Sequence, residues 1–387
     1  MTLIAAAAVV SARGVHRPGW VEVSADRIVA VGSGRPAQPA DHEFAEAIVV
    51  PGFVDMHVHG GGGASYPEPD EIGRAALFHR NHGTTTTVAS LVTAAPAELL
   101  TQVRALAEAA HAGVVAGIHL EGPWLSAARC GAHDATQLRD PDSRELDHLL
   151  GAADGTLRMV TLAPELPGGA EAIRRLVAAG VVVAVGHTEA TYEQAGTAVE
   201  LGATVGTHLF NAMRPLNHRD PGAALALLDD PRVTVELIAD GVHLHPAMVR
   251  HVIHTAGPDR VALITDAMAA AGLADGPYRL GPMDVEVRAG VARIPGQSTI
   301  AGSTVTMDRV FRAMVHDATC DTELSAAVAM TATTPARTLG LPGVGDLAPE
   351  FAANLVVLDA GLRIHAVMSG GSWVSADGPD PLCSSGV

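Results

Sequence analysis

The sequence contains no lysine, and all 25 of its basic residues are arginine. Its three cysteines, Cys130, Cys320 and Cys383, form no Cys-x-x-Cys pair, which argues against a disulfide framework or a zinc ribbon and predicts a cytoplasmic protein. No apolar run reaches the roughly 18 residues that span a bilayer. Because the formal net charge is −17, nucleic acid and anionic membranes are poor partners.

Hydrophobic residues, by contrast, make up 48% of the 387-residue chain. This length and composition are sufficient for one large α/β barrel and a smaller domain. Residues 1–10 are apolar but carry no basic leader, so we interpret them as an edge strand and not as a signal peptide.

Short apolar segments alternate with helical patterns from residue 53 onward. Helices are predicted over 97–112 and over 170–179, the latter closed by Gly180. Near-continuous apolar strands indicate a parallel sheet that is buried on both faces. The eight candidate strands are 53–59, 84–91, 114–121, 157–165, 181–187, 203–210, 233–241 and 261–267. Eight such units predict a (β/α)8 TIM-like barrel in the α/β class.

Strand patterns also occur near both ends of the chain. They predict a small flanking β-sandwich domain built from residues 1–50 and 345–387, beside a catalytic barrel over 51–344. Residues 275–300 are typical of a small β insertion, and helices resume over about 306–340.

Potential metal ligands begin with His57-Val58-His59, at the end of the first predicted barrel strand. Side chains alternate along a strand, so His57 and His59 point to the same side. A His-x-His pair of this kind can occur by chance in a chain with 19 histidines. The residues at the other strand ends must therefore show whether this pair belongs to a metal site.

Those other ends do carry histidine or carboxylate. They contribute His119, Glu121, His187, His208, Asp240, His243 and Asp266. In a (β/α)8 barrel the carboxyl ends of the strands form one active-site face, so these side chains are expected to converge. Histidine combined with carboxylate favours Zn²⁺ or Fe²⁺ over Ca²⁺ or Mg²⁺.

The motifs around these residues resemble the N-acetylglucosamine-6-phosphate deacetylase family of the amidohydrolase superfamily. The resemblance runs from about residue 50 to 310. It rests on His119-Leu-Glu-Gly-Pro-Trp124, Gly186-His-Thr188, Thr207-His-Leu-Phe-Asn-Ala-Met213, Ile238-Ala-Asp-Gly-Val-His243, Thr265-Asp-Ala267 and Ala301-Gly-Ser303. The superfamily often bridges two metals with a carbamylated lysine, which is impossible here, so the bridging carboxylate falls to Glu121.

The resemblance implies a divalent metal, zinc first and iron as the alternative. Glu121, His187 and His208 match the metal site of the family. Retention of His57 and His59 implies a second ion, shared with Asp266, although one ion or two stays open. Asp266 matches the catalytic acid and base, and His133 matches the histidine that contacts the substrate amide.

The resemblance also implies a phosphate-bearing substrate and a homodimer in which Arg219 reaches the neighbouring active site. The residues expected to bind substrate are Ala132, His133, Asn211, Ala212, Arg219, Asp240, Gly241, Val242, His243, Ile300, Ala301 and Gly302. Arg214 and His218 are further candidates for the phosphate. His119 is expected to support a ligand, and no role is assigned to Cys130.

The predicted function is hydrolysis of the acetamide of N-acetyl-D-glucosamine 6-phosphate to D-glucosamine 6-phosphate and acetate, in amino-sugar catabolism or cell-wall recycling. N-acetylgalactosamine 6-phosphate is the nearest alternative substrate. More distant alternatives are another amidohydrolase reaction and a non-catalytic sugar-phosphate binder, which would not need an acid and base such as Asp266.

Overall fold

The computed structural model describes residues 1–316 and 323–374. The chain divides into two compact units, and each has its own sheet. One unit comprises Met56–Ala76 and Thr87–Thr306, and the remaining described residues form the other. Whether residues 51–344 fold as a domain by themselves stays a prediction.

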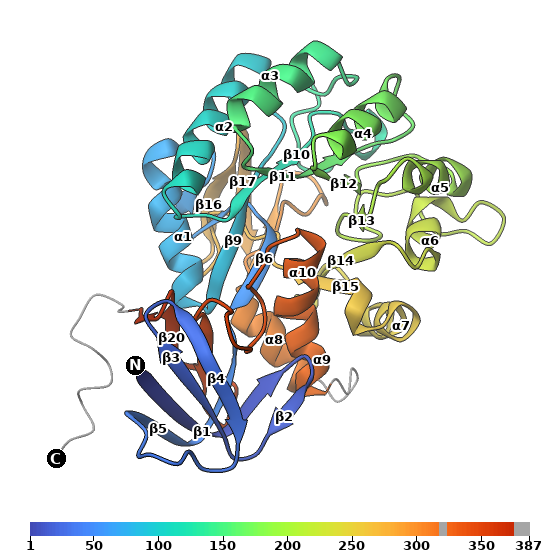
Figure 1. The fold of residues 1–387 in the computed structure, drawn as a ribbon. Coiled ribbons are helices and arrows are strands. Elements are labelled where there is room, and N and C mark those ends of the chain that lie inside the picture. The colour runs from blue at the N-terminus through green and yellow to red at the C-terminus, as the bar shows by residue number, and fades with distance from the viewer. Residues whose placement is uncertain (317–322, 375–387) are drawn as a thin grey trace. The chain divides into compact units, whose positions relative to one another are not determined.

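Eight strands form the near-closed parallel barrel that the sequence predicts (Figure 1). They are β6 (Phe53–Val58), β9 (Thr84–Leu91), β10 (Gly117–Glu121), β11 (Leu157–Leu162), β12 (Val182–Val185), β13 (Val205–Gly206), β14 (Thr234–Ile238) and β15 (Val261–Ile264). At the carboxyl ends, Asp266 N donates to His57 O (2.9 Å) and His59 N donates to Ala267 O (2.8 Å). These bonds join the end of the first strand to the end of the eighth.

All the barrel strands except β9 are shorter than the sequence predicts, and β12 and β13 show a clear reason. β13 ends at Gly206 and β12 at Val185, although the apolar pattern continues to 210 and 187. The reason is the backbone, because His187 and His208 have positive φ angles (47° and 24°) that a strand cannot contain. The chain therefore leaves the sheet where the predicted ligands occur.

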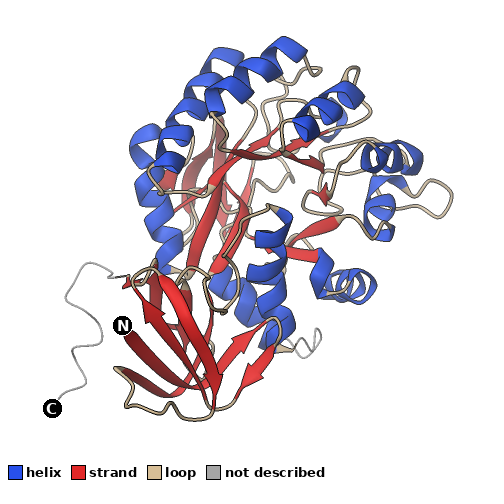
Figure 2. Cartoon of the chain, in the orientation of Figure 1, coloured by secondary structure: helices blue, strands red, loops and turns tan. Residues whose placement is uncertain are grey.

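Helices lie outside the strands (Figure 2). They are α1 (Ile72–Asn81), α2 (Pro96–His111), α3 (Ser143–Ala153), α4 (Gly169–Ala178), α5 (Tyr192–Glu200), α6 (Gly222–Asp229) and α7 (Pro246–Ala256), with 3₁₀ turns at Pro69–Glu71, Ala127–Arg129 and Pro258–Arg260. The predicted helices 97–112 and 170–179 correspond to α2 and α4. Thr191 and Gln194 form a capping box at the start of α5, which satisfies backbone N–H groups that would otherwise lack partners.

The predicted β insertion is a three-stranded antiparallel sheet of β16 (Gly276–Leu280), β17 (Met283–Arg288) and β18 (Val291–Arg293). Its buried side chains pack against Ala132, Met268 and Ala301. The insertion therefore supports loops that carry predicted substrate-binding residues. A two-stranded ribbon, β7 (Gly60–Gly61) and β8 (Ala64–Ser65), follows β6.

The terminal strands form one eight-stranded sheet in the order β21-β20-β19-β5-β1-β3-β4, with β2 paired to β1. The strands are β1 (Thr2–Ser11), β2 (Gly14–His16), β3 (Gly19–Ser24), β4 (Arg27–Ser33), β5 (His42–Pro51), β19 (Leu355–Leu358), β20 (Ile364–Ser369) and β21 (Ser372–Trp373). Side chains from both ends of this order share one core, so the β domain built from both chain ends is confirmed. The edge position predicted for residues 1–10 is wrong, because β5 pairs with β1 from a distant part of the chain.

The same unit contains α8 (Met307–His316), α9 (Leu324–Val328), a π-helical turn (Ala329–Thr333) and α10 (Thr334–Thr338). These helices agree with the prediction for 306–340, of which 317–322 lie outside the described residues. Residues 375–387 of the predicted β domain also lie outside them. Among the described residues, no helix is both long enough and apolar enough to cross a membrane.

Candidate active site

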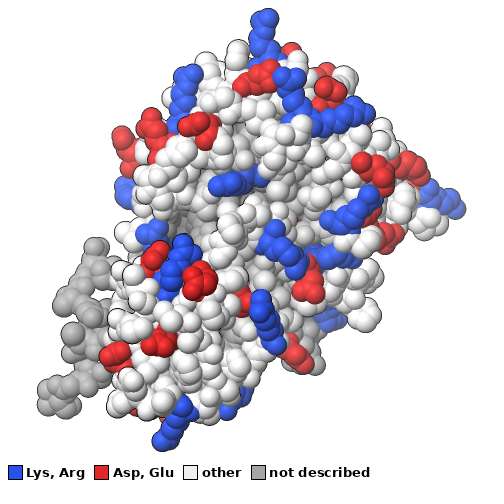
Figure 3. Space-filling model, in the orientation of Figure 1, with Lys and Arg blue, Asp and Glu red and all other residues white. Residues whose placement is uncertain are grey.

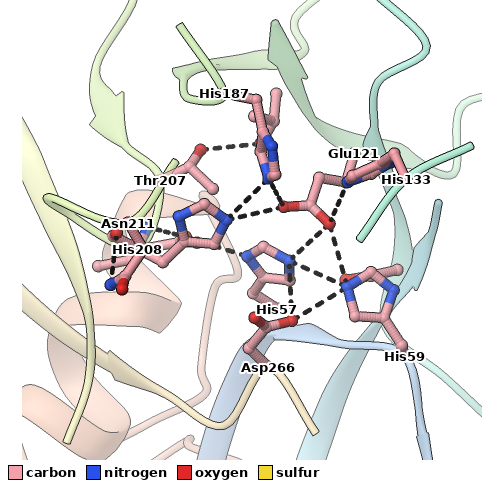
Figure 4. A network of polar contacts seen from close by, with 12 residues as sticks. His57, His59, Glu121, His133, His187, Thr207, His208, Asn211 and Asp266 are labelled. Carbon is pink, nitrogen blue, oxygen red and sulfur yellow. Dashed lines mark hydrogen bonds and ion pairs between the residues drawn. The ribbon is translucent and has the colours of Figure 1, made fainter. Parts of the chain in front are cut away.

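Four side chains from the ends of β6, β10 and β15 meet in a buried cluster (Figure 4). His57 Nε2 lies 3.2 Å from His59 Nε2. His59 Nε2 lies 3.2 Å from Glu121 Oε2 and 3.1 Å from Asp266 Oδ1. The structure therefore brings the predicted first-strand pair, Glu121 and Asp266 into one group.

The other oxygen of the same carboxylate serves a second group. Glu121 Oε1 is 3.0 Å from His187 Nε2 and 2.9 Å from His208 Nε2, and these two nitrogens are 3.1 Å apart. Glu121 lies between the two pairs of histidines, with one oxygen toward each. This is the arrangement that a carboxylate bridging two ions requires.

Backbone conformation directs several of these side chains inward. His187, His208 and Asp266 all have positive φ angles (47°, 24° and 47°), which are uncommon for residues with a Cβ. Such strain is typical of functional sites, where the surrounding structure holds an otherwise unfavourable turn.

The donor set fits a divalent metal. Imidazole nitrogens are good ligands when they present a lone pair, and four of them face the Glu121 carboxylate within hydrogen-bonding distance or slightly beyond. Burial opposes the charged form of Glu121, but His57 and His187 outweigh burial and hold the pKa of this carboxyl well below its usual range. Among the residues that the structure describes, the buried ring nitrogens His59 Nδ1 and His208 Nδ1 find no hydrogen-bond partner.

The charge balance of the cluster supports the same conclusion. Burial lowers the pKa of His59, yet Asp266 and Glu121 raise it to about 9. Burial also opposes the charged form of Asp266, but His57 and His59 hold the pKa of this carboxyl below its usual value. The two carboxylates thus favour positive charge between them, which a divalent metal supplies.

A cavity of about 360 Å³ opens onto the cluster. Its wall contains His59, Glu121, His187, His208 and Asp266, together with the predicted substrate-binding residues Ala132, His133, Asn211, Ala212, His243, Ile300 and Gly302. The volume is within the range of pockets that bind small ligands. The predicted catalytic residues and most predicted substrate residues therefore share one pocket.

Other predicted substrate residues lie outside the cavity wall. Ala301 is fully buried next to Ile300 and Gly302. Asp240 Oδ1 accepts hydrogen bonds from the backbone N–H groups of Val242 and His243, both at 2.9 Å, across the turn at Gly241.

Arg219, also outside that wall, belongs to the exposed segment 215–220, which extends outward before α6 in Figure 1. Arg214 is paired with Asp220 and Glu189. The structure thus places Arg214 in ion pairs and Arg219 on an exposed loop outside the cavity wall.

The surroundings of His243 favour its protonated form, which attracts an anion. Its Nδ1 is 2.8 Å from Asp240 Oδ2. Burial lowers the pKa of His243, but the hydrogen bond and charge of Asp240 outweigh burial and raise it above the usual value. This imidazole therefore keeps a proton to higher pH than an exposed histidine.

The surroundings of His133, by contrast, favour its neutral form. Burial lowers its pKa to about 4, so the ring is neutral at pH 7. The backbone N–H of Thr93 donates to His133 Nδ1 (3.2 Å), which puts the ring proton on Nε2. His133 Nε2 is 3.3 Å from Glu121 Oε2 and faces the cavity as a hydrogen-bond donor.

Sequence reasoning missed Thr93, Arg129 and Glu236. Arg129 lines the cavity and pairs with Glu189. Glu236 is fully buried in β14 and hydrogen bonds to His57. A charged residue within the apolar stretch Thr234-Val-Glu-Leu-Ile238 was the signal for Glu236, whereas nothing in the sequence pattern singles out Thr93.

His119 supports the cluster without belonging to it. Its Nδ1 is 2.9 Å from Ser90 Oγ and its Nε2 is 2.8 Å from Thr161 Oγ1, so both ring nitrogens have partners. The centroid of its ring lies 4.5 Å from that of His57 in an edge-on arrangement. His119 therefore packs against a cluster histidine, in agreement with a supporting role. Cys130 is free and partly exposed.

Comparison with known proteins places this site in a family. The amidohydrolase family model matches residues 48–374. The N-acetylgalactosamine-6-phosphate deacetylase of Escherichia coli O157:H7 is 36% identical over 366 residues, which are 92% of this chain and 96% of that protein. The N-acetylglucosamine-6-phosphate deacetylase of Bos taurus is 37% identical over 346 residues, which are 84% of this chain and 83% of that protein.

A solved structure is similar over nearly the whole chain. It is a mutant N-acetyl-D-glucosamine-6-phosphate deacetylase from Mycobacterium smegmatis in complex with N-acetyl-D-glucosamine-6-phosphate. It is 55% identical, has a TM-score of 0.95, and the match covers 97% of this chain and 99% of that one. With a family model that spans the barrel, relatives that align over most of the sequence and a buried histidine–carboxylate cluster at the strand ends, this chain belongs to the amidohydrolase family.

Proposed function

We propose that this protein is a metal-dependent deacetylase of N-acetyl-D-glucosamine 6-phosphate. It hydrolyses the acetamide to D-glucosamine 6-phosphate and acetate, a step of amino-sugar catabolism or cell-wall recycling. The observation that carries the proposal is the buried Glu121 cluster at the floor of a cavity large enough for one sugar phosphate. The relatives named above support the substrate.

The residues that would hold the metal fall into two groups around Glu121. Glu121, His187 and His208 would bind one ion, and His57, His59 and Asp266 would complete a site for a second. Nitrogen and oxygen donors of this kind favour zinc, with iron as the alternative. When bound, a divalent metal supplies Lewis acidity that polarises the amide carbonyl and makes water a nucleophile at neutral pH.

Asp266 moves the proton. Its carboxylate lies on the cavity wall, and its lowered pKa keeps it ionised and ready to accept. It takes a proton from the attacking water as the water oxygen bonds to the carbonyl carbon. It then gives that proton to the nitrogen as the C–N bond breaks, because a neutral amine leaves far more easily than an amide anion.

His133 holds the amide oxygen. The proton on Nε2 faces the cavity, so the neutral ring can donate to the carbonyl as negative charge develops on oxygen. Asn211 and Ala212 line the same cavity and would hold the sugar through the backbone. We also propose a cytoplasmic location, which the cysteine pattern supports.

Acetate release from three sugars tests the substrate. We expect fast turnover of N-acetylglucosamine 6-phosphate and much slower turnover of the galactosamine epimer and of unphosphorylated N-acetylglucosamine. Faster turnover of the epimer would assign the protein instead to the activity named for its Escherichia coli relative. Equal turnover with and without phosphate would contradict the phosphate site.

We further propose that the protein is a homodimer in which Arg219 binds the substrate phosphate of the neighbouring subunit. The projecting position of Arg219 supports this proposal. Replacing it with Gln should raise KM for the phosphorylated sugar by about 10- to 100-fold, since a hydrogen bond to a charged group contributes about 1.5–3 kcal/mol. Arg250→Gln, at an exposed position of α7, is the control and should leave KM unchanged.

Mixed dimers test whether Arg219 acts across the interface. Arg219→Gln and Asp266→Asn chains should each be inactive or weak alone. Co-assembled, they should regain activity, because an intact Asp266 on one chain meets an intact Arg219 on the other. Absence of any recovery in verified mixed dimers would contradict action in trans.

The Asp240–His243 pair predicts a pH dependence of substrate binding. A protonated His243 attracts phosphate, and this contribution is complete at low pH and is lost as pH rises through the raised pKa of His243. Asp240→Asn removes the carboxylate that raises the pKa of His243, so this pKa should fall. KM should then begin to rise at a lower pH than in the wild type. Comparing the two proteins with one substrate cancels the titration of the substrate phosphate. Identical KM profiles would contradict the role of His243.

A further inference from the structure

Glu236, a fully buried carboxylate in β14, contacts two histidines of the cluster at once. Its Oε2 is 3.1 Å from the ring nitrogen His57 Nδ1 and accepts a hydrogen bond from the backbone N–H of His208 (3.2 Å). Its backbone oxygen accepts from Leu209 N (2.9 Å). One residue therefore holds both a ring from β6 and the main chain that follows β13.

The contact with His57 decides which ring nitrogen faces the cluster. A backbone N–H can only donate, so Glu236 Oε2 acts as an acceptor at this position. The same oxygen then accepts a hydrogen bond from the Nδ1–H of His57, so Nε2 carries a lone pair when the ring is neutral. His57 Nε2 is the nitrogen that points at His59 and Glu121. Carboxylate partners commonly fix metal-binding histidines in this way.

The contacts with His208 and Leu209 support a strained turn. His208 has a φ of 24°, outside the regions that residues with a Cβ prefer. Two consecutive backbone N–H groups of this turn donate to Glu236, one to its side chain and one to its main chain. The turn is what directs His208 Nε2 to within 2.9 Å of Glu121 Oε1.

We propose that Glu236 is a positioning residue that presents His57 Nε2 and His208 Nε2 to the divalent metal, one on each side of Glu121. It acts through the ligands and does not reach the cavity wall formed by the described residues. The inference rests on the metal site of the proposed function but not on its sugar substrate, and metal binding is measured with no substrate present.

Competition between the protein and a chromophoric chelator for Zn²⁺ tests the proposal. Glu236→Gln keeps the shape of the side chain and removes its charge, and we expect Zn²⁺ affinity to fall by about 10- to 100-fold. The matched control is Asp308→Asn. Asp308 belongs to the other compact unit, and its Oδ1 lies 3.2 Å from His82 Nδ1. The substitution therefore changes a carboxylate–imidazole contact of the same chemistry. This control should keep the wild-type affinity.

Thermal unfolding of both apoproteins separates positioning from general stability. Wild-type Zn²⁺ affinity in Glu236→Gln would overturn the proposal, as would an equal loss in Asp308→Asn at a similar fall in Tm. Failure to bind Zn²⁺ in the wild type would overturn the metal site itself, whereas an unexpected sugar preference would leave Glu236 unaffected.

The tautomer of His57 offers a test without any substitution. In ¹⁵N-histidine NMR spectra of the Zn²⁺-loaded wild-type protein, His57 should carry its proton on Nδ1. A proton on Nε2 would overturn the proposal even if Glu236→Gln did not fold.

Discussion

Replacing Asp266 with Asn should lower kcat by about 10²- to 10⁴-fold, the range of a lost general acid–base group. The amide of Asn keeps an oxygen at the position that now lies 3.1 Å from His59 Nε2, but it cannot accept and return a proton. Bound metal should therefore fall much less than turnover does. Steady-state acetate release together with metal analysis of the same sample measures both quantities.

A buried carboxylate from the other unit is the control for Asp266. Asp346 is buried and pairs with Arg13, so Asp346→Asn should reduce stability and leave kcat unchanged. Turnover of Asp266→Asn within threefold of the wild type would contradict the proposed proton transfer, although not the fold.

Replacing Glu121 with Gln should remove both activity and metal. One oxygen of Glu121 faces His57 and His59, and the other faces His187 and His208, so both groups lose their shared anion. We expect kcat/KM to fall by at least about 10³-fold, equivalent to roughly 4 kcal/mol of lost transition-state stabilisation. Metal content per chain and acetate release measure the effect.

Chelation provides the stability test of the same residue. A metal that binds only the folded state stabilises it by about 2.7 kcal/mol at a hundredfold excess over Kd. Chelator should therefore lower the Tm of the wild type and leave that of Glu121→Gln unchanged. A variant that keeps its metal and the chelator-sensitive Tm would show that Glu121 is not the shared ligand.

Much of this site followed from simple rules of sequence. A period of two put His57 and His59 on one side of a strand. The choice of Glu121 as the bridging group came instead from the resemblance to a superfamily that often uses a carbamylated lysine, a residue that this sequence lacks. The rule that barrel strands end at one face then joined residues that are far apart in sequence. These rules work because they depend on local geometry and on the direction of strands.

Other features depend on contacts that a one-dimensional pattern does not contain. Glu236 in β14 reaches His57 in β6, although the two strands are not neighbours in the order of the sheet. Thr93 fixes the tautomer of His133 through a backbone N–H, which any residue but proline could supply. The strained angles at His187 and His208 shortened two predicted strands because apolar sequence continues where the backbone already turns.

The surface explains why composition alone could not locate the phosphate site. On the face shown in Figure 3, arginine and acidic side chains are interspersed over the described residues. Several of the arginines are paired, for example Arg139 with Glu145 and Arg232 with Asp230. A net charge of −17 therefore says little about the charge within one local pocket. In that pocket, Arg219 of the neighbouring subunit and His243 are expected to bind the phosphate.

The central claim is that metal held around Glu121 is needed to deacetylate N-acetylglucosamine 6-phosphate. The most direct measurement is acetate release by apoprotein as Zn²⁺ is returned in known equivalents. We predict no turnover without metal and a linear recovery that ends at one or two ions per chain, which also settles their number. Full turnover by protein shown to contain no metal would contradict the account.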